Sequence, residues 1–142
     1  MPDATQRFLC IASYEKGHDF LRQAAEMGVR PTLLTLEKLR QAEWPRESLE
    51  DLATIPAGLT QEQICRTVCW MARGRRFDRI IALDEFDLET AAQLREHMRI
   101  DGMGVTTTAF YRDKLAMRTG ARKAGFLVPE FCPILNYDEL RA

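Results

Sequence analysis

Long hydrophobic runs are missing from this sequence of 142 residues. Its first seven residues include an acid, Asp3, and the apolar patch that follows, from Phe8 to Ala12, has only the length of a strand. Signal peptides and transmembrane helices both need longer apolar segments than this patch. We therefore predict a cytoplasmic protein with no membrane partner.

A large net charge is missing as well. The sequence has 20 Lys and Arg against 21 Asp and Glu, which leaves a net charge of −1. Nucleic acids attract proteins that carry a clear excess of basic residues. The near balance of charge therefore argues against a nucleic-acid partner.

Metal ligands are few. The four cysteines are Cys10, Cys65, Cys69 and Cys132. A structural zinc site needs four ligands, and the only histidines, His18 and His97, lie far in sequence from the cysteine pair at 65 and 69. We predict no metal site in this chain, and cysteines that are buried or half-buried thiols in a reducing compartment.

Several motifs of nucleotide-binding and catalytic domains are also absent. The loop after the first apolar patch reads Ser13-Tyr14-Glu15-Lys16-Gly17, which differs from the G-x-G-x-x-G of dinucleotide-binding domains. No G-x-x-x-x-G-K-[ST] occurs, which excludes a P-loop enzyme. No Ser-His-Asp or Cys-His set can be assigned to a nucleophilic mechanism.

The sequence does have the composition of a folded domain, with 46% hydrophobic and 29% charged residues. Apolar runs predict strands at residues 8–12, 31–36, 53–55 and 77–83. Helical periodicity predicts helices at 17–27, 60–74, 87–98 and 108–124, with short helical pieces between 37 and 52. This alternation predicts an α/β fold: an open, mainly parallel four-stranded sheet with helices on both faces, Rossmann-like, ending in a linker helix.

Two of the predicted helices begin with capping residues. Thr60 and Gln63 have the spacing of a capping box, in which each side chain satisfies a backbone donor of the first turn. Asp87 is expected to cap the helix that follows the fourth strand.

Candidate binding residues follow the first and fourth predicted strands. Ligands of open parallel sheets bind beyond the carboxyl ends of the strands. Tyr14 follows the first strand, and Asp84 and Glu85 follow the fourth. The two acids could hold a metal, orient a substrate amine or act as a base. They are also explained as helix-start residues, which the positive end of a helix dipole favours.

Lys114 lies in a basic stretch of the last predicted helix. It comes four residues after Phe110, at the edge of the apolar face that Phe110 shares with Met117 and Ala121. Its stem could pack on that face while its ammonium reaches into a cleft and meets a phosphate. A surface lysine that extends into solvent explains the same spacing.

The last residues resemble an interrupted helix. Asn136 and Asp138 read as a helix start, with only a few residues after them. A helix nucleus that short does not persist alone. We expect that another domain begins here, and a frayed natural C-terminus is the alternative.

Four pieces of sequence resemble the N-terminal half of ATP-grasp ligases. In order, they are the acidic segment 84–95 after the fourth strand, the Gly102-Met103-Gly104 turn, the Asp113-Lys114 pair, and the exit Ala124-Gly125-Phe126-Leu127-Val128-Pro129. The resemblance extends over residues 78–135. Residues 1–77 share with the family only the alternation of strands and helices.

The resemblance implies a function and its site residues. ATP-grasp ligases join a carboxylate to an amine or a similar nucleophile through an acyl phosphate, which they make from ATP with Mg²⁺. The resemblance implies that Lys114 contacts the ATP phosphates and that Glu85 lines the substrate cleft. Asp84 and Tyr14 are further candidate cleft residues because of their place at the strand ends. It also implies a homodimer and small-molecule carboxylate and amine substrates.

The resemblance further implies a domain division. Residues 1–107 would form the pre-ATP-grasp domain, 108–128 a connecting helix, and 129–142 the start of a truncated ATP-grasp domain. Since the other ATP and magnesium ligands of the family lie downstream, no catalytic residue is expected here and the chain alone should be inactive. The alternative is a free-standing flavodoxin-like binding or dimerisation module without catalysis.

Overall fold

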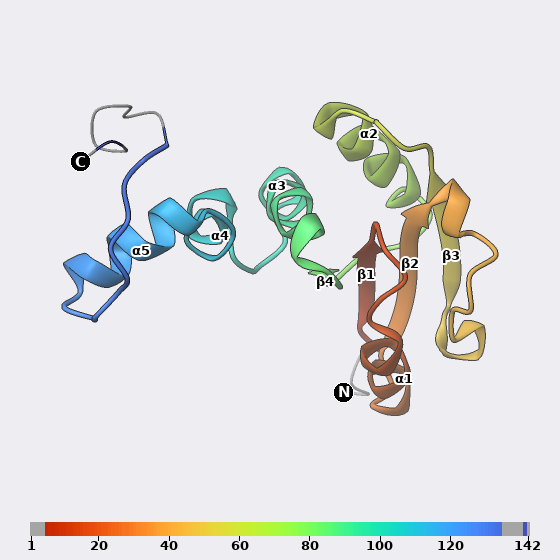
Figure 1. Ribbon diagram of the computed structural model, residues 1–142. Helices are drawn as coiled ribbons and strands as arrows, with labels where there is room; N and C mark the ends of the chain where they lie inside the picture. The colour runs from red at the N-terminus through yellow and green to blue at the C-terminus, as the bar shows by residue number, and fades with distance from the viewer. Residues whose placement is uncertain (1–4, 135–140, 142) are drawn as a thin grey trace.

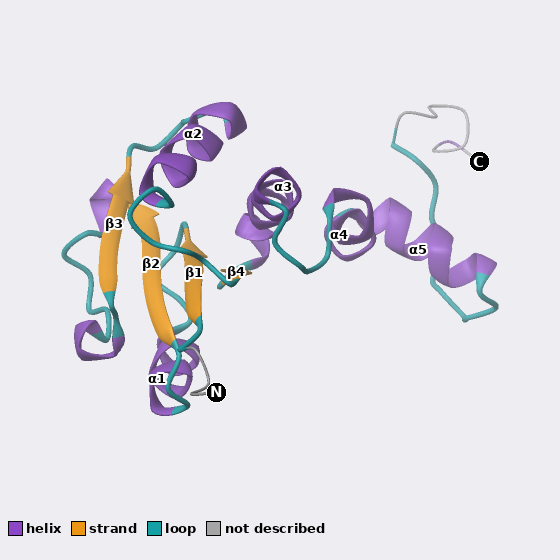
Figure 2. Cartoon of the chain, turned by 180° about the vertical axis from the view of Figure 1, so that it is seen from behind, coloured by secondary structure: helices purple, strands orange, loops and turns teal. Residues whose placement is uncertain are grey.

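The computed structural model describes residues 5–134 and 141, and its centre is a parallel four-stranded sheet (Figures 1 and 2). The strands are β1 (Arg7–Ala12), β2 (Arg30–Leu36), β3 (Asp51–Ile55) and β4 (Arg79–Ala82). Their spatial order is β3-β2-β1-β4, and all three strand pairs are parallel. The predicted fold class, an open parallel sheet with helices on both faces, is confirmed.

The order of the strands creates a switch point between β1 and β4. The chain proceeds from β1 outward to β2 and β3, and then returns to the other side of β1 to form β4. The helices that follow these two strands, α1 (His18–Glu26) after β1 and α3 (Leu88–Met98) after β4, lie on opposite faces of the sheet. Crevices at the carboxyl ends of such strand pairs are where open α/β sheets bind ligands.

Helices α2 (Gln61–Met71) and α3 (Leu88–Met98) cover one face of the sheet. Alternate strand residues point to this face, which explains why β1 contributes Leu9 and Ile11 but not Cys10. The buried core on this side comprises Leu9, Ile11, Leu34, Ile55, Val68, Phe77, Ile80, Ala91 and Leu94. The predicted capping box is confirmed, since Gln63 N–H donates to the Thr60 hydroxyl and Thr60 N–H donates to the Gln63 side chain.

The other face is covered by α1 (His18–Glu26) and by the short 3₁₀ turns η1 (Glu37–Leu39) and η2 (Arg46–Ser48). Its buried core comprises Cys10, Ala12, Leu21, Leu33 and Trp44. Gly17 precedes α1 with φ 86°, and a Cβ there would lie 2.8 Å from Leu83 Cδ1. Only glycine therefore allows α1 to start this close to the end of β4.

Beyond α3, two helices form an arm that extends away from the sheet (Figure 1). They are α4 (Val105–Arg112), which packs on α3, and α5 (Lys114–Lys123), which packs on α4. We call them the α4–α5 arm. No side chain of α5 is buried.

The single helix predicted over residues 108–124 is wrong, because the chain breaks at Asp113. This residue is extended, with φ −89° and ψ 110°, and its carboxylate accepts the backbone N–H groups of Leu115 and Ala116 at 2.8 and 3.2 Å. Asp113 thus ends one helix and caps the next, as short acidic side chains often do. Phe110 and Lys114 therefore belong to different helices, and the apolar face drawn through both does not exist.

The predicted helix start at Asn136 and Asp138 lies outside the described residues. Within residues 5–134, no helix has the length and apolar character that a membrane crossing requires.

Candidate functional site

The carboxyl ends of β1 and β4 are tied together by a buried carboxylate. Asp87, 3% exposed, accepts hydrogen bonds from the backbone N–H of Ser13 at 2.8 Å and from the Ser13 hydroxyl at 2.5 Å. Asp87 does occupy the N-cap position of α3, but its side chain makes no capping hydrogen bond, so the predicted cap is wrong. The carboxylate instead accepts hydrogen bonds from Ser13, which lies close to it because β1 and β4 are neighbours and end side by side.

A second buried carboxylate, that of Asp84, stabilises the same rim. Asp84 is 8% exposed, accepts the backbone N–H of Phe86 at 3.1 Å, and pairs with the Lys16 ammonium at 2.6 Å. The hydrogen bond from Lys16, joined by the backbone N–H of Phe86, holds the pKa of Asp84 below its usual value. The same contact raises the pKa of Lys16.

A cavity of about 260 Å³ opens at this edge of the sheet. Ser13 and Asp87 form its polar side, and Ile55 and Ile64 contribute to its apolar side. The Gln61 amide donates to the Thr90 hydroxyl at 3.0 Å and so links α2 to α3 beside the cavity. A small open cavity with polar and apolar walls offers room for part of a small organic molecule.

An aromatic cluster lies on the outer side of the rim. The rings of Tyr14 and Phe86 have centroids 5.1 Å apart, and the Arg112 guanidinium lies 5.3 Å from the Phe86 centroid. Tyr14 and Phe86 are 48% and 50% exposed, so solvent reaches both rings. This contact brings the end of α4 to the carboxyl end of β4.

The structure places the predicted site residues as follows. Tyr14, Asp84 and Glu85 share the rim of β1 and β4, within the loops after these strands and the 3₁₀ turn η3 (Glu85–Asp87). Glu85 is exposed, whereas the Asp84 side chain is fully engaged by Lys16 and Phe86. Lys114 is exposed at the start of α5, two residues after Arg112.

Ser13 and Asp87 were expected from the sequence at this rim, but the contact between them was not, and neither was the role of Lys16. Each follows a predicted strand, so the rule that sites lie at carboxyl ends includes them. The pairing of Ser13 with Asp87 depends on β4 returning beside β1, and this strand order cannot be deduced from apolar runs alone. The described residues contain no group of three or more His, Cys, Asp or Glu side chains that could hold a metal.

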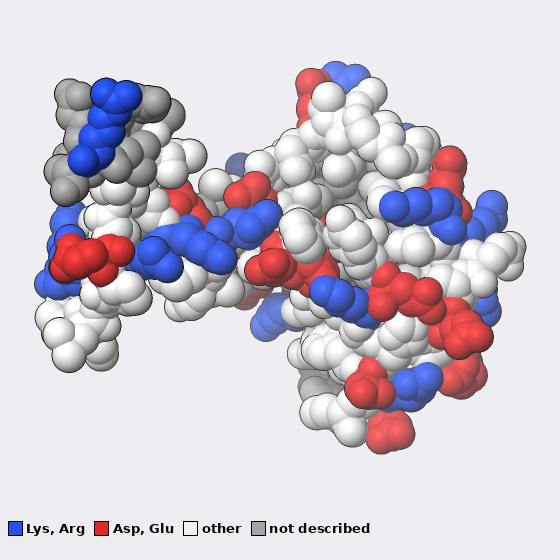
Figure 3. Space-filling model, viewed as in Figure 1, with Lys and Arg blue, Asp and Glu red and all other residues white. Residues whose placement is uncertain are grey.

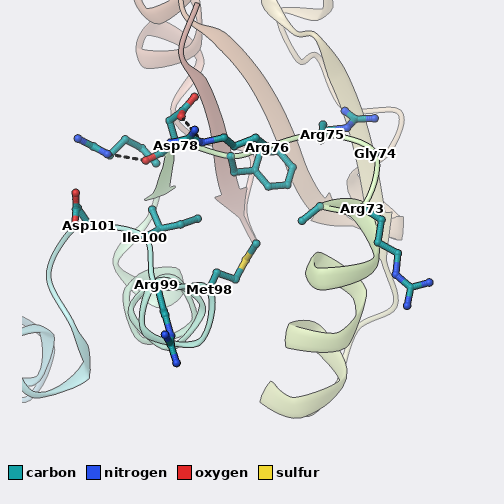
Figure 4. A pocket seen from close by; sticks show the side chains of 12 residues that line it. Arg73, Gly74, Arg75, Arg76, Asp78, Met98, Arg99, Ile100 and Asp101 are labelled. Atoms are coloured by element: carbon teal, nitrogen blue, oxygen red, sulfur yellow. Dashed lines mark hydrogen bonds and ion pairs between the residues drawn. The ribbon is translucent and has the colours of Figure 1, made fainter. Parts of the chain in front are cut away.

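A larger cavity, of about 640 Å³, lies at the opposite edge of the sheet (Figure 4). The loop before β4 and the residues after α3 line it, including Arg76, Asp78 and Ile100. Arg76 pairs with Asp78 at 3.1 Å, and Arg79 donates to the Asp78 carbonyl. Because parallel sheets bind ligands beyond their carboxyl ends, we assign the candidate site to the rim of β1 and β4 with the smaller cavity beside it. The predicted site residues do not line that cavity: they are Tyr14, Asp84, Glu85 and Lys114.

Comparison with known proteins gives likeness in structure only. No protein-family model and no curated protein matches the sequence. An L-amino acid ligase from Bacillus licheniformis superposes with a TM-score of 0.76 at 20% identity, covering 89% of this chain and 32% of the ligase. A phosphoribosylglycinamide synthetase from Anaerococcus prevotii gives 0.71 at 12% identity, covering 96% of this chain and 33% of the synthetase.

A third structure is the biotin carboxylase domain dimer of the Hydrogenobacter thermophilus 2-oxoglutarate carboxylase, in complex with MgADP, ADP and bicarbonate. Its TM-score is 0.69 at 18% identity, and the match covers 94% of this chain and 31% of that one. The chain thus spans about a third of the length of each of these proteins. The likeness to these three proteins shows the fold, and it agrees with the parallel α/β sheet predicted from the sequence.

Proposed function

We propose that this chain is the substrate-cleft domain of an ATP-grasp ligase that joins a carboxylate to an amine or a similar nucleophile through an acyl phosphate. The observation that carries the proposal is the rim at the switch point between β1 and β4. Buried Asp84 and Asp87 fix its shape, whereas Glu85 and Tyr14 stay exposed there to meet a substrate. The likeness in fold to ligases supports the same assignment.

The α4–α5 arm supports a partner region beside this rim. Large apolar side chains of the arm and of the segment after it are only partly covered. Phe110, Tyr111, Leu115 and Met117 of the arm, and Phe126 and Leu127 after it, are each at least 41% exposed. Exposed apolar surface of this extent on a two-helix arm marks an interaction site. We propose that the ATP-grasp domain of a longer protein packs here. In the proposed division, residues 1–107 form the first domain, residues 108–128 the connection, and residues 129–142 the start of that ATP-grasp domain.

Nucleotide contact in this chain depends on Lys114. Basic side chains lie along the α4–α5 arm (Figure 3), and Lys114 has no ion-pair partner among residues 5–134. A free ammonium there is suited to offset phosphate charge when ATP binds. Asp84 and Asp87 are already engaged, and the described residues contain no group of three or more His, Cys, Asp or Glu side chains that could hold a metal, so we propose that Mg²⁺ takes its ligands from the rest of a longer protein. The chain alone is therefore proposed to be inactive.

The test is replacement of Lys114 in a longer protein that contains this chain. K114A should weaken ATP use about tenfold or more, which corresponds to about 1.4 kcal/mol. Lys123→Ala, at the other end of α5, is the matched control and should leave ATP use unchanged. The measurement is steady-state ADP release as a function of ATP concentration.

An unchanged KM and turnover in K114A would remove Lys114 from the nucleotide site. A longer protein that releases no ADP with any carboxylate and amine pair would instead favour the binding module without catalysis. The cytoplasmic location and the homodimer stay predictions of this proposal.

A further inference from the structure

The α4–α5 arm buries few of its own side chains against the rest of the protein. Within residues 105–123, which the structure describes in full, only Thr108 is buried. Apolar burial stabilises in proportion to the area removed from water, so packing alone gives the arm a weak hold on α3. The arm nevertheless leaves α3 in a defined direction (Figure 1), which other contacts have to fix.

The Arg95 guanidinium, in the last turn of α3, holds the turn that leads to α4. It is 8% exposed and donates to the Met103 carbonyl and to the Ile80 carbonyl, each at 2.8 Å. Since Ile80 lies in β4, one side chain joins the turn to the sheet. No carboxylate pairs with Arg95 among the described residues, and burial lowers its pKa. A buried charge is costly without hydrogen bonds, so the two carbonyls keep the guanidinium in place.

The next residue of α3, Glu96, supplies the cap that α4 lacks. Gly104 occupies the N-cap position of α4 and has no side chain to accept the first backbone N–H groups of that helix. The Glu96 carboxylate accepts the Val105 N–H at 2.8 Å instead. The positive end of the helix dipole favours a carboxylate at this position. Helix α3 therefore binds the turn through Arg95 and the start of α4 through Glu96.

The two glycines of the turn leave room for these two side chains. A Cβ at Gly102 would lie 2.6 Å from Arg95 Cδ, and a Cβ at Gly104 would collide with the Glu96 carboxylate. Gly102 also has φ 147°, which residues with a side chain rarely adopt. The Gly102-Met103-Gly104 turn is thus shaped around Arg95 and Glu96.

The arm that this turn directs reaches the rim of β1 and β4. Arg112, at the end of α4, has its guanidinium 5.3 Å from the centroid of the Phe86 ring in η3. Lys114 begins α5 two residues later. The direction of α4 therefore decides where Lys114 lies relative to the rim.

We propose that Arg95 and Glu96 are positioning residues. They fix the direction in which the α4–α5 arm leaves α3, and through it they fix the place of Lys114 beside the rim. The direction of the arm depends only on contacts within this chain, whereas the part played by Lys114 rests on the proposed function. Loss of either contact frees the turn and lets the arm change direction.

The direction of the arm is tested with backbone N–H residual dipolar couplings of the whole chain. In the wild type, the couplings of the sheet, α3 and α4 should fit one alignment tensor. In Arg95→Ala and in Glu96→Ala, the couplings of α4 should leave that fit, while those of the sheet and α3 keep it. His97→Ala is the matched control, because His97 is exposed on the same helix and makes neither contact.

Glu96 is exposed, so E96A leaves the buried core intact and decides the test alone if R95A does not fold. A variant whose α4 couplings keep the common fit shows that its residue does not position the arm. A wild type whose α4 couplings do not fit the common tensor overturns the proposal as a whole.

The effect on Lys114 is tested by ADP release from a longer protein that contains this chain. E96A should raise the KM for ATP about threefold or more, and E96A combined with K114A should be no worse than K114A alone, because Glu96 acts through Lys114. Additive losses, or an unchanged KM in E96A, would overturn this second part. If K114A itself leaves ATP use unchanged, the proposed function fails and the second part fails with it, whereas the couplings still decide the direction of the arm.

Discussion

Replacement of Asp87 by Ala should destabilise the protein strongly, because this residue joins the ends of β1 and β4. Its carboxylate is 3% exposed and accepts two hydrogen bonds from Ser13. Hydrogen bonds to charged groups contribute about 1.5–3 kcal/mol each, and unpaired buried donors cost about 1–3 kcal/mol. Removing a buried charge offsets part of this loss. We expect the free energy of unfolding to fall by about 2–4 kcal/mol.

The assay is urea unfolding followed by circular dichroism. Asp87→Asn keeps the shape and one acceptor oxygen, so its free energy of unfolding should lie between those of the wild type and D87A. Asp101→Ala is the control, because Asp101 is exposed and makes no ion pair among the described residues. If D87A differs from D101A by less than about 0.5 kcal/mol, the tie between the two strands is not what fixes the rim.

Three further outcomes test the rim, the core and the arm. Lys16→Met should raise the pKa of Asp84 toward its ordinary value, as carboxyl ¹³C NMR would measure. A depressed folded pKa stabilises the protein above the ordinary carboxyl pKa, and this stabilisation is lost as pH falls through the folded pKa. The variant should therefore be less stable than the wild type near neutral pH, and the difference should shrink at acid pH. An unshifted titration would contradict the ion pair. Burial raises the pKa of Cys10 to about 12, so native protein should resist alkylation of Cys10 at neutral pH while urea-unfolded chain reacts, as mass spectrometry would show. Asp113→Ala should speed amide hydrogen exchange in the first turn of α5 and cost about 1 kcal/mol locally; unchanged exchange would mean that the cap does not hold the turn.

Much of the fold could be predicted from the sequence because local signals agreed with it. Continuous apolar runs marked the buried strands, and the observed strands differ from the predicted ones by at most two residues at an end. The capping box of Thr60 and Gln63 marked the start of α2 because its hydrogen bonds are local. Parallel pairing followed from the helices or helical turns that separate each strand from the next.

The wrong predictions concern polar side chains that can form two different sets of hydrogen bonds. Asp113 fits a helical wheel, yet its carboxylate stabilises a new helix start better than it stabilises a helix interior. Asp87 fits a cap, yet Ser13 is brought to it from 74 residues away. Contacts at such separations depend on strand order, which the sequence pattern does not contain.

The central claim is that Lys114 and the rim of β1 and β4 face one cleft that a further domain completes. The most direct measurement is a crystal structure of a longer protein containing this chain, with Mg²⁺ and a non-hydrolysable ATP analogue. We expect the Lys114 Nζ within about 3 Å of a phosphate oxygen, and Glu85 and Tyr14 lining the adjacent substrate space. A Lys114 ammonium in bulk solvent, on the side of the molecule away from Glu85, would contradict the account.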